Sequence, residues 1–146
     1  MPDIKKTKIV PFTPAQMYDL VNDINEYPKF VPWCSRSEIL SQSDDEIKAR
    51  LFFEGGGFTK SFTTCNRLQK NKMVELRLLD GPFRHLEGFW QFEPHLDGQC
   101  EVLLDLEFEL SSGILSLAFG PMFHQVANTL VDAFCKRAHE VYGSAG

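Results

Sequence analysis

The sequence predicts one α+β domain in which a curved antiparallel sheet lies around a long helix. Two observations carry this prediction. Residues 34–109 alternate between apolar and polar side chains in several runs, and residues 113–142 repeat apolar side chains at three- and four-residue intervals. A chain of 146 residues with 43% hydrophobic content can bury one such core and is too short for two ordinary domains. We therefore expect residues 1–146 to form a single domain.

The N-terminal segment predicts a strand followed by an amphipathic helix. Residues 4–10 alternate well enough for a strand, and Thr13 with Pro14 provides a helix N-cap with proline at the first helical position. One apolar stripe follows at helical spacing, formed by Met17, Leu20, Val21 and Ile24. We expect a loop to begin at Asn25.

Residues 27–34, Tyr-Pro-Lys-Phe-Val-Pro-Trp-Cys, form the most unusual segment of the chain. The two prolines restrict the backbone, while Tyr27, Phe30 and Trp33 present large apolar faces. Such a segment is either a packed connector between helix and sheet or one wall of an apolar cavity. The sequence leaves both interpretations open.

Six strands are expected after this connector, joined as antiparallel hairpins. Residues 47–53 alternate as a half-buried strand, and Gly55, Gly56 and Gly57 form a flexible turn into a strand at 58–65. A meander is the most economical topology for such a series.

The later strands show the clearest alternation. Asn71 precedes a strand at 73–79, and a turn at 97–98 joins the strands at 86–92 and 102–108. In the last strand apolar side chains alternate mostly with carboxylates, so the sheet has one dry face and one wet face. The apolar face must therefore pack against another element of the chain.

Residues 113–142 provide this element as a long helix. Its apolar stripe consists of Phe119, Phe123, Val126, Leu130, Phe134 and Val141. Gly120 and Pro121 should kink or restart the helix. Residues 114–123 are apolar on nearly every side, which fits either a gate that opens at this point and touches a membrane, or deep burial.

Composition and charge exclude several classes of protein. The formal net charge of -5 is spread without a long run of either sign, so we expect no broad contact with duplex DNA. No segment approaches the ~20 apolar residues of a transmembrane helix, and no secretory signal is recognised. Cys34, Cys65, Cys100 and Cys135 lack C-x-x-C spacing, which indicates free, mostly buried thiols in a cytoplasmic protein.

No catalytic or metal site is predicted. His85 and Glu87 stand two positions apart on one strand, where a carboxylate can orient an imidazole, but both should point to the wet face. No serine or cysteine accompanies them in a nucleophile motif. His95, His124 and His139 lie on different elements without metal-ligand spacing.

Two stretches of the chain resemble the START-like helix-grip domains, and within them the branch of coenzyme-Q-binding proteins and ribosome-association toxins. They are residues 27–34, given above, and residues 81–92, Gly-Pro-Phe-Arg-His-Leu-Glu-Gly-Phe-Trp-Gln-Phe. The resemblance covers nearly the whole chain. It implies the helix-grip (START-like, Bet v 1-like) fold, a curved seven-stranded antiparallel sheet wrapped around a long C-terminal helix, with an apolar tunnel between them.

The same resemblance implies that the bound ligand is a polyprenyl quinone or similar ubiquinone-like lipid, without a catalytic cofactor. Members of the branch are thought to act as quinone chaperones in respiration and ubiquinone biosynthesis, and some bacterial members are described as toxins that bind the large ribosomal subunit. A polyketide cyclase shares the fold but needs inward acid-base groups, whereas the inward positions here are mostly apolar.

A tunnel for such a ligand requires apolar walls and a few polar groups that orient the head group. The predicted lining is Phe30, Trp33, Phe53, Leu76, Leu78, Leu86, Trp90, Leu104, Leu106, Phe123, Leu130 and Phe134. Arg84 is the expected donor at the mouth, and Gly88 leaves room for a ligand or for close helix packing. Each apolar member could instead simply fill a core.

The predicted function is therefore that of a non-enzymatic carrier of a polyprenyl quinone or similar lipid, cytoplasmic and in transient contact with the inner face of the membrane. The alternative is a translation inhibitor that binds the large ribosomal subunit and blocks subunit joining. Lys136, Arg137 and His139 offer a small basic patch for that contact, although the helix dipole is a sufficient reason for these charges.

Overall fold

A computed structural model of the protein describes residues 3–55 and 57–143. The elements follow in the order β1 (Asp3–Val10), α1 (Pro14–Asn22), η1 (Ile24–Lys29), β2 (Cys34–Gln42), β3 (Glu46–Gly55), β4 (Phe58–Gln69), β5 (Met73–Asp80), β6 (Phe83–Pro94), β7 (Cys100–Leu110), α2 (Gly113–Ala118) and α3 (Gly120–Tyr142). The strands form one seven-stranded antiparallel sheet in the order β1-β7-β6-β5-β4-β3-β2. The predicted α+β helix-grip fold is confirmed.

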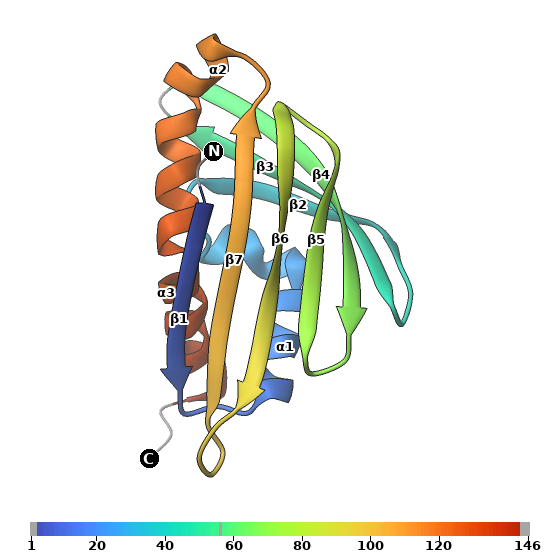
Figure 1. The fold of residues 1–146 in the computed structure, drawn as a ribbon, viewed down its shortest axis with the longest axis vertical. Coiled ribbons are helices and arrows are strands. Elements are labelled where there is room, and N and C mark those ends of the chain that lie inside the picture. The colour runs from blue at the N-terminus through green and yellow to red at the C-terminus, as the bar shows by residue number, and fades with distance from the viewer. Residues whose placement is uncertain (1–2, 56, 144–146) are drawn as a thin grey trace.

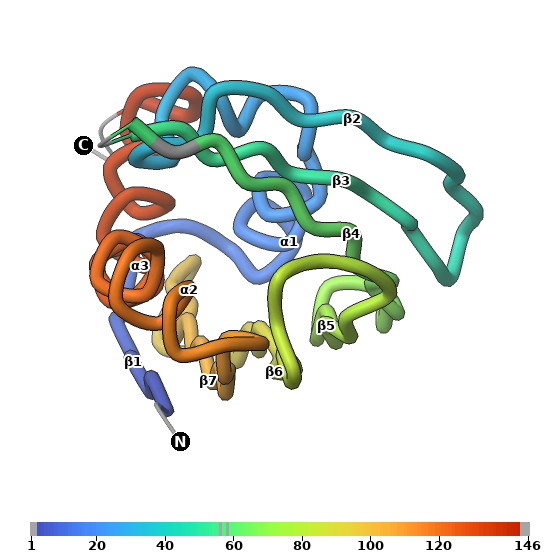
Figure 2. The backbone as a smooth tube through the Cα atoms, turned by 90° about the horizontal axis from the view of Figure 1, so that it is seen from above, coloured from blue at the N-terminus to red at the C-terminus, as the bar shows by residue number. Residues whose placement is uncertain are grey.

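The sheet is strongly curved around the helices. It bends from β1 and β7 through β5 to β3 and β2, and α3 occupies the open side of the curve (Figure 2). Helix α3 runs beside β1, and α1 lies on the same concave side, behind β6 in the view of Figure 1. Strand β7 buries every second residue, as expected for a sheet with one dry face. The main core therefore lies inside the curve.

Helix α1 begins where the sequence predicts. Thr13 Oγ1 accepts a hydrogen bond from the Gln16 backbone N–H at 3.2 Å, and the Gln16 side chain accepts one from the Thr13 N–H at 2.9 Å. The loop expected from Asn25 is wrong, because the chain continues as the 3₁₀ helix η1. Tyr27 holds this turn against α1, since its buried hydroxyl donates to the Val21 carbonyl.

The terminal helix divides as predicted just before Pro121, with Phe119 between α2 and α3. Phe119 is buried, whereas Ile114 and Leu117 of α2 are 81% and 84% exposed. Deep burial of the whole apolar segment is therefore wrong. Helix α2 lies at one end of the molecule, above the strand connections (Figure 1).

Two of the predicted turns use left-handed backbone. Asn71 between β4 and β5 has a φ of 62°, and Gly98 between β6 and β7 has a φ of 71°. In the third predicted turn, Gly56 lies outside the described residues. Gly55 ends β3, and Gly57 precedes β4 with a φ of 84°.

Candidate functional site

A cavity of about 80 Å³ lies between the concave face of the sheet and α3. Strands β3 to β7 provide one side, α3 the other, and η1 with Val31 closes a third. The connector is thus both packed and part of a cavity wall. The lining contains no acidic or basic side chain.

Phe123 lines the cavity from the first turns of α3. Its ring centroid lies 4.8 Å from that of Phe108, 4.9 Å from that of Phe83 and 5.7 Å from that of Phe62. All three are edge-to-face pairs, which each add about 0.5–1.5 kcal/mol beyond area burial. The sheet and the first turns of α3 are therefore joined here by direct aromatic packing.

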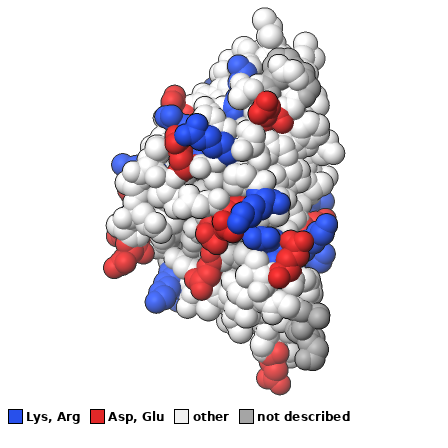
Figure 3. Space-filling view, turned by 180° about the vertical axis from the view of Figure 1, so that it is seen from behind, with Lys and Arg blue, Asp and Glu red and all other residues white. Residues whose placement is uncertain are grey.

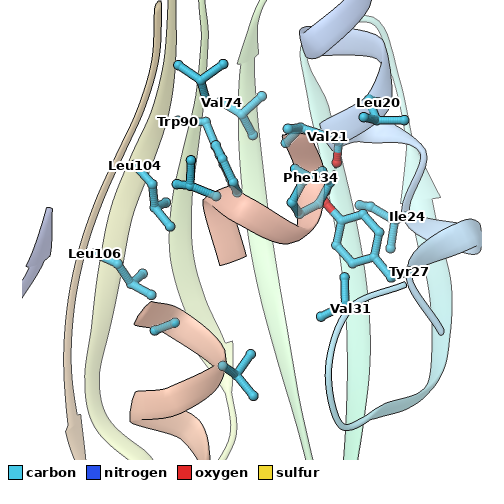
Figure 4. Close-up of a cluster of buried hydrophobic side chains, with 14 of the residues drawn as sticks. Leu20, Val21, Ile24, Tyr27, Val31, Val74, Trp90, Leu104, Leu106 and Phe134 are labelled. Carbon is cyan, nitrogen blue, oxygen red and sulfur yellow. Dashed lines mark hydrogen bonds between the residues drawn. The ribbon is translucent and has the colours of Figure 1, made fainter. Parts of the chain in front are cut away.

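Phe134 makes similar aromatic contacts farther along α3. Figure 4 shows its ring between Trp90 on the sheet and Tyr27 on η1. The centroid distances from Phe134 are 5.0 Å to Trp90 and 5.3 Å to Tyr27. Burial raises the pKa of the Tyr27 hydroxyl far above its ordinary value, so this group acts as a neutral hydrogen-bond donor.

Thr64 and Asn66 bring hydrogen-bonding groups to this apolar lining. Both side chains are buried, and the Thr64 hydroxyl donates to Asn66 Oδ1 over 2.8 Å. They stand two residues apart on β4 and therefore point to the same face of the sheet. The cavity thus has a polar point on a wall that is otherwise apolar.

The predicted site residues divide into two groups. Those that line the cavity are Phe53, Leu76, Leu86, Trp90, Leu106, Phe123, Leu130 and Phe134. Those that do not are Phe30, Trp33, Leu78, Arg84, Gly88 and Leu104. Leu104 is fully buried, and Phe30 and Leu78 are half-buried against the core, so these three pack against other side chains instead.

Trp33 and Arg84 lie outside the cavity lining for separate reasons. Trp33 has a left-handed φ of 67° and is 43% exposed, with its ring over Gly55, where an added Cβ would lie 2.1 Å from it. The Arg84 side chain is 65% exposed, and its Nη1 lies 3.3 Å from Glu109 Oε1. Neither side chain reaches the cavity.

Gly88 makes room for a strand and not for a ligand or a helix. A Cβ built on it would lie 2.1 Å from the Asp105 carbonyl oxygen and 2.9 Å from Leu106 Cα. The missing side chain lets β6 approach β7 closely. The sequence prediction for this glycine is therefore wrong about which object fills the space.

Several lining residues are not among those expected from the sequence. They are Ile24, Tyr27, Val31, Ala49, Leu51, Phe62, Thr64, Asn66, Val126 and Ala127. Alternation along β3 and helical spacing along α3 could have identified the members on those two elements. Thr64 and Asn66 gave no such signal, because polar residues on a strand predict a wet face.

A cluster of titratable side chains lies on the outer face of the sheet. His85 Nε2 is 3.5 Å from Glu87 Oε1 and 3.5 Å from Glu107 Oε2. These ligand atoms all lie within 4.8 Å of one another, close enough to hold one divalent cation. The sequence did not single out Glu107, which reaches the cluster from β7 because it is paired opposite Glu87. The cluster points away from the cavity and does not serve it.

The four cysteines are free, as predicted. Cys34, Cys100 and Cys135 are buried, and we call them the buried thiols. Burial raises the pKa of each of them from 9.0 to about 11. Because the nucleophile is the thiolate, the buried thiols are poor nucleophiles near neutral pH.

The surface carries both charges side by side. On the face shown in Figure 3, Lys and Arg side chains lie among Asp and Glu side chains. In the expected basic patch near the end of α3, the Arg137 guanidinium lies 5.3 Å from the Phe30 ring centroid and 3.5 Å from Glu26. Arg137 thus ties α3 to η1. Within the described residues, no helix is long and apolar enough to cross a membrane.

One protein family and two named relatives are similar to this chain in sequence. The family described as polyketide cyclase / dehydrase and lipid transport matches residues 10–135. The ribosome association toxin RatA of Pseudomonas aeruginosa is 40% identical over 140 residues, which are 96% of this chain and 97% of the relative. The mitochondrial coenzyme Q-binding protein COQ10 homolog B of Xenopus laevis is 32% identical over 145 residues, which are 97% of this chain and 59% of that protein.

A solved structure extends the comparison. The aromatase/cyclase from Streptomyces sp. R1128 superposes with a TM-score of 0.79 and 21% identity, covering 99% of this chain and 98% of that one. At this identity the likeness shows a shared fold alone.

Proposed function

The chain belongs to the polyketide cyclase / dehydrase and lipid transport family, and we propose that it binds a polyprenyl quinone or similar neutral lipid and acts as its carrier. The observation that carries the proposal is the cavity under α3, which is buried, apolar and free of charged side chains. Such a site favours a neutral apolar ligand, because an ion placed there would lose its hydration without a partner. The name of the Xenopus laevis relative, coenzyme Q-binding protein, supports the choice of a quinone.

The proposed role is non-enzymatic. Acid-base catalysis on a bound ligand needs a titratable group within hydrogen-bond reach of it. Among the lining residues, only Tyr27 has a titratable side chain, and its hydroxyl already donates to the Val21 carbonyl. A cytoplasmic carrier that works by burial and release needs no such group.

The cavity volume requires that the protein opens for a long ligand. One water needs roughly 10–15 Å³ of such a cavity, so about 80 Å³ accepts roughly five to eight water-sized groups. A ~50-carbon isoprenoid tail is much larger, although each enclosed methylene contributes about 0.8 kcal/mol. We assign the opening to α2, none of whose residues is buried.

The test is mass spectrometry of an organic extract from protein purified without detergent from its own cells. We expect close to one quinone per wild-type chain and less in Ala127→Leu, which fills the cavity from α3. Asn128→Leu adds the same side chain on the exposed side of α3 and should leave the content unchanged. A folded wild-type protein with an empty extract contradicts the proposal.

A second candidate is association with the ribosome, which the name of the Pseudomonas aeruginosa relative favours, and we propose the large subunit as the partner. This function uses the outer surface and should not depend on the cavity. The test is sedimentation of ribosomal subunits with purified protein. Equal inhibition of subunit joining by wild type and Ala127→Leu supports the surface role, whereas no effect of either protein contradicts it.

A further inference from the structure

We infer that Asn66, held by Thr64, donates a hydrogen bond to an oxygen acceptor on the ligand, so that the cavity prefers a quinone carbonyl to a quinol hydroxyl. This inference rests on the proposed binding of a lipid in the cavity. It specifies which atom of the ligand the protein recognises and which redox state of the ligand binds more tightly.

The Asn66 amide is oriented by Thr64. Its Oδ1 accepts the hydroxyl hydrogen of Thr64 over 2.8 Å. The opposite end of the amide is Nδ2, which has two N–H donors. Within the described part of the chain, Nδ2 donates no hydrogen bond to any other residue, so its donors are available to a ligand in the cavity.

Asn66 has two cross-strand neighbours in the sheet. Asn66 is paired with Ile47 on β3 and with Leu76 on β5. These cross-strand neighbours are apolar and offer no acceptor side chain. A ligand oxygen at this point would give the Asn66 amide donors the hydrogen-bond partner that these neighbours do not provide.

The side chains of the lining limit which ligands can bind. Because the lining holds no cationic side chain, a carboxylate or phosphate would be buried without a counter-charge. A carbonyl oxygen only accepts hydrogen bonds, which matches the free Nδ2 donors of Asn66. A quinol hydroxyl also brings a hydrogen, which would have to share an acceptor, Asn66 Oδ1 or the Thr64 hydroxyl oxygen, that is already engaged in the Thr64–Asn66 hydrogen bond. The oxidised form therefore fits this point better.

The test measures binding by equilibrium dialysis with three probes that share a ten-carbon tail: a decyl benzoquinone, its quinol and decylbenzene, which lacks ring oxygens. Wild type should bind the quinone most tightly. Asn66→Leu should lower quinone affinity about three- to tenfold and leave decylbenzene binding unchanged. Thr64→Val keeps the side-chain shape and frees Oδ1, so it should reduce the preference for quinone over quinol.

The outcomes separate this inference from the carrier proposal. If wild type binds all three probes and neither variant alters their relative affinities, the Asn66 inference is overturned while lipid binding stands. If wild type binds none of them, both are overturned. Thermal melting of each ligand-free variant shows whether it is folded, and Thr64→Val provides the readout if Asn66→Leu does not fold.

Discussion

Ala127→Leu is expected to stabilise the ligand-free protein, because the new side chain enters an existing cavity. The substitution adds three carbons, and roughly five to eight water-sized groups fit in about 80 Å³. Burial of three methylene-sized groups contributes about 2.4 kcal/mol at about 0.8 kcal/mol each. Ordering the leucine side chain costs about 0.5–1 kcal/mol. The net expectation is a gain of about 1.5 kcal/mol in the free energy of unfolding.

The assay is urea denaturation of refolded, lipid-free protein, since a bound ligand would raise the apparent stability of the wild type alone. The matched control is Ala138→Leu on the same helix. Ala138 is fully buried but does not line the cavity, so a leucine there should overpack the core and cost about 1–3 kcal/mol. If Ala127→Leu destabilises the protein as much as Ala138→Leu, the cavity does not exist as described and the reasoning fails.

Three further outcomes follow from the packing. Gly88→Ala should lower the free energy of unfolding by about 2–3 kcal/mol in the same denaturation assay, because the added methyl meets the backbone of β7. The control is Gly113→Ala, which has open space around the added methyl and should not change the free energy of unfolding measurably. Arg84→Ala should change stability by less than about 1 kcal/mol and leave quinone binding intact by dialysis, since its ion pair is exposed. The buried thiols keep their protons in the folded state up to a pKa of about 11 and release them near 9 when unfolded, so stability should fall as the pH rises from 9 to 11. The fall in the free energy of unfolding should be smaller in a variant with the three buried thiols replaced by alanine. An equal fall in wild type and variant would show that these thiols do not cause it.

The architecture was predictable because its signals are local. Alternation marks a strand whenever one sheet face is dry, and the 3.6-residue period marks α3 for the same reason. The capping pair of Thr13 and Pro14 needs only adjacent residues. Each of these features depends on a short stretch of sequence, and the structure confirms them.

The features that the sequence did not reveal depend on distant neighbours. Gly88 is required because the backbone of β7 leaves no space for a side chain there. Strand β7 lies beside β6 in the sheet but is distant from Gly88 in the sequence. Trp33 turns outward because of its own left-handed φ and the bare backbone of Gly55. Asn66 faces inward although it is polar, and only the strand register shows this. Composition and periodicity contain none of this information.

The packing also indicates where a ligand enters. Tyr27 fixes η1 to α1, and Arg137 fixes it to α3, so moving η1 would break a buried hydrogen bond and an ion pair with Glu26. Moving the body of α3 would separate the rings of Phe123 and Phe134 from the sheet. Helix α2 has no buried residue, and its first turn is held by the Ser112 cap. Displacing α2 therefore costs the least, and we expect a lipid to enter beside its exposed apolar side chains.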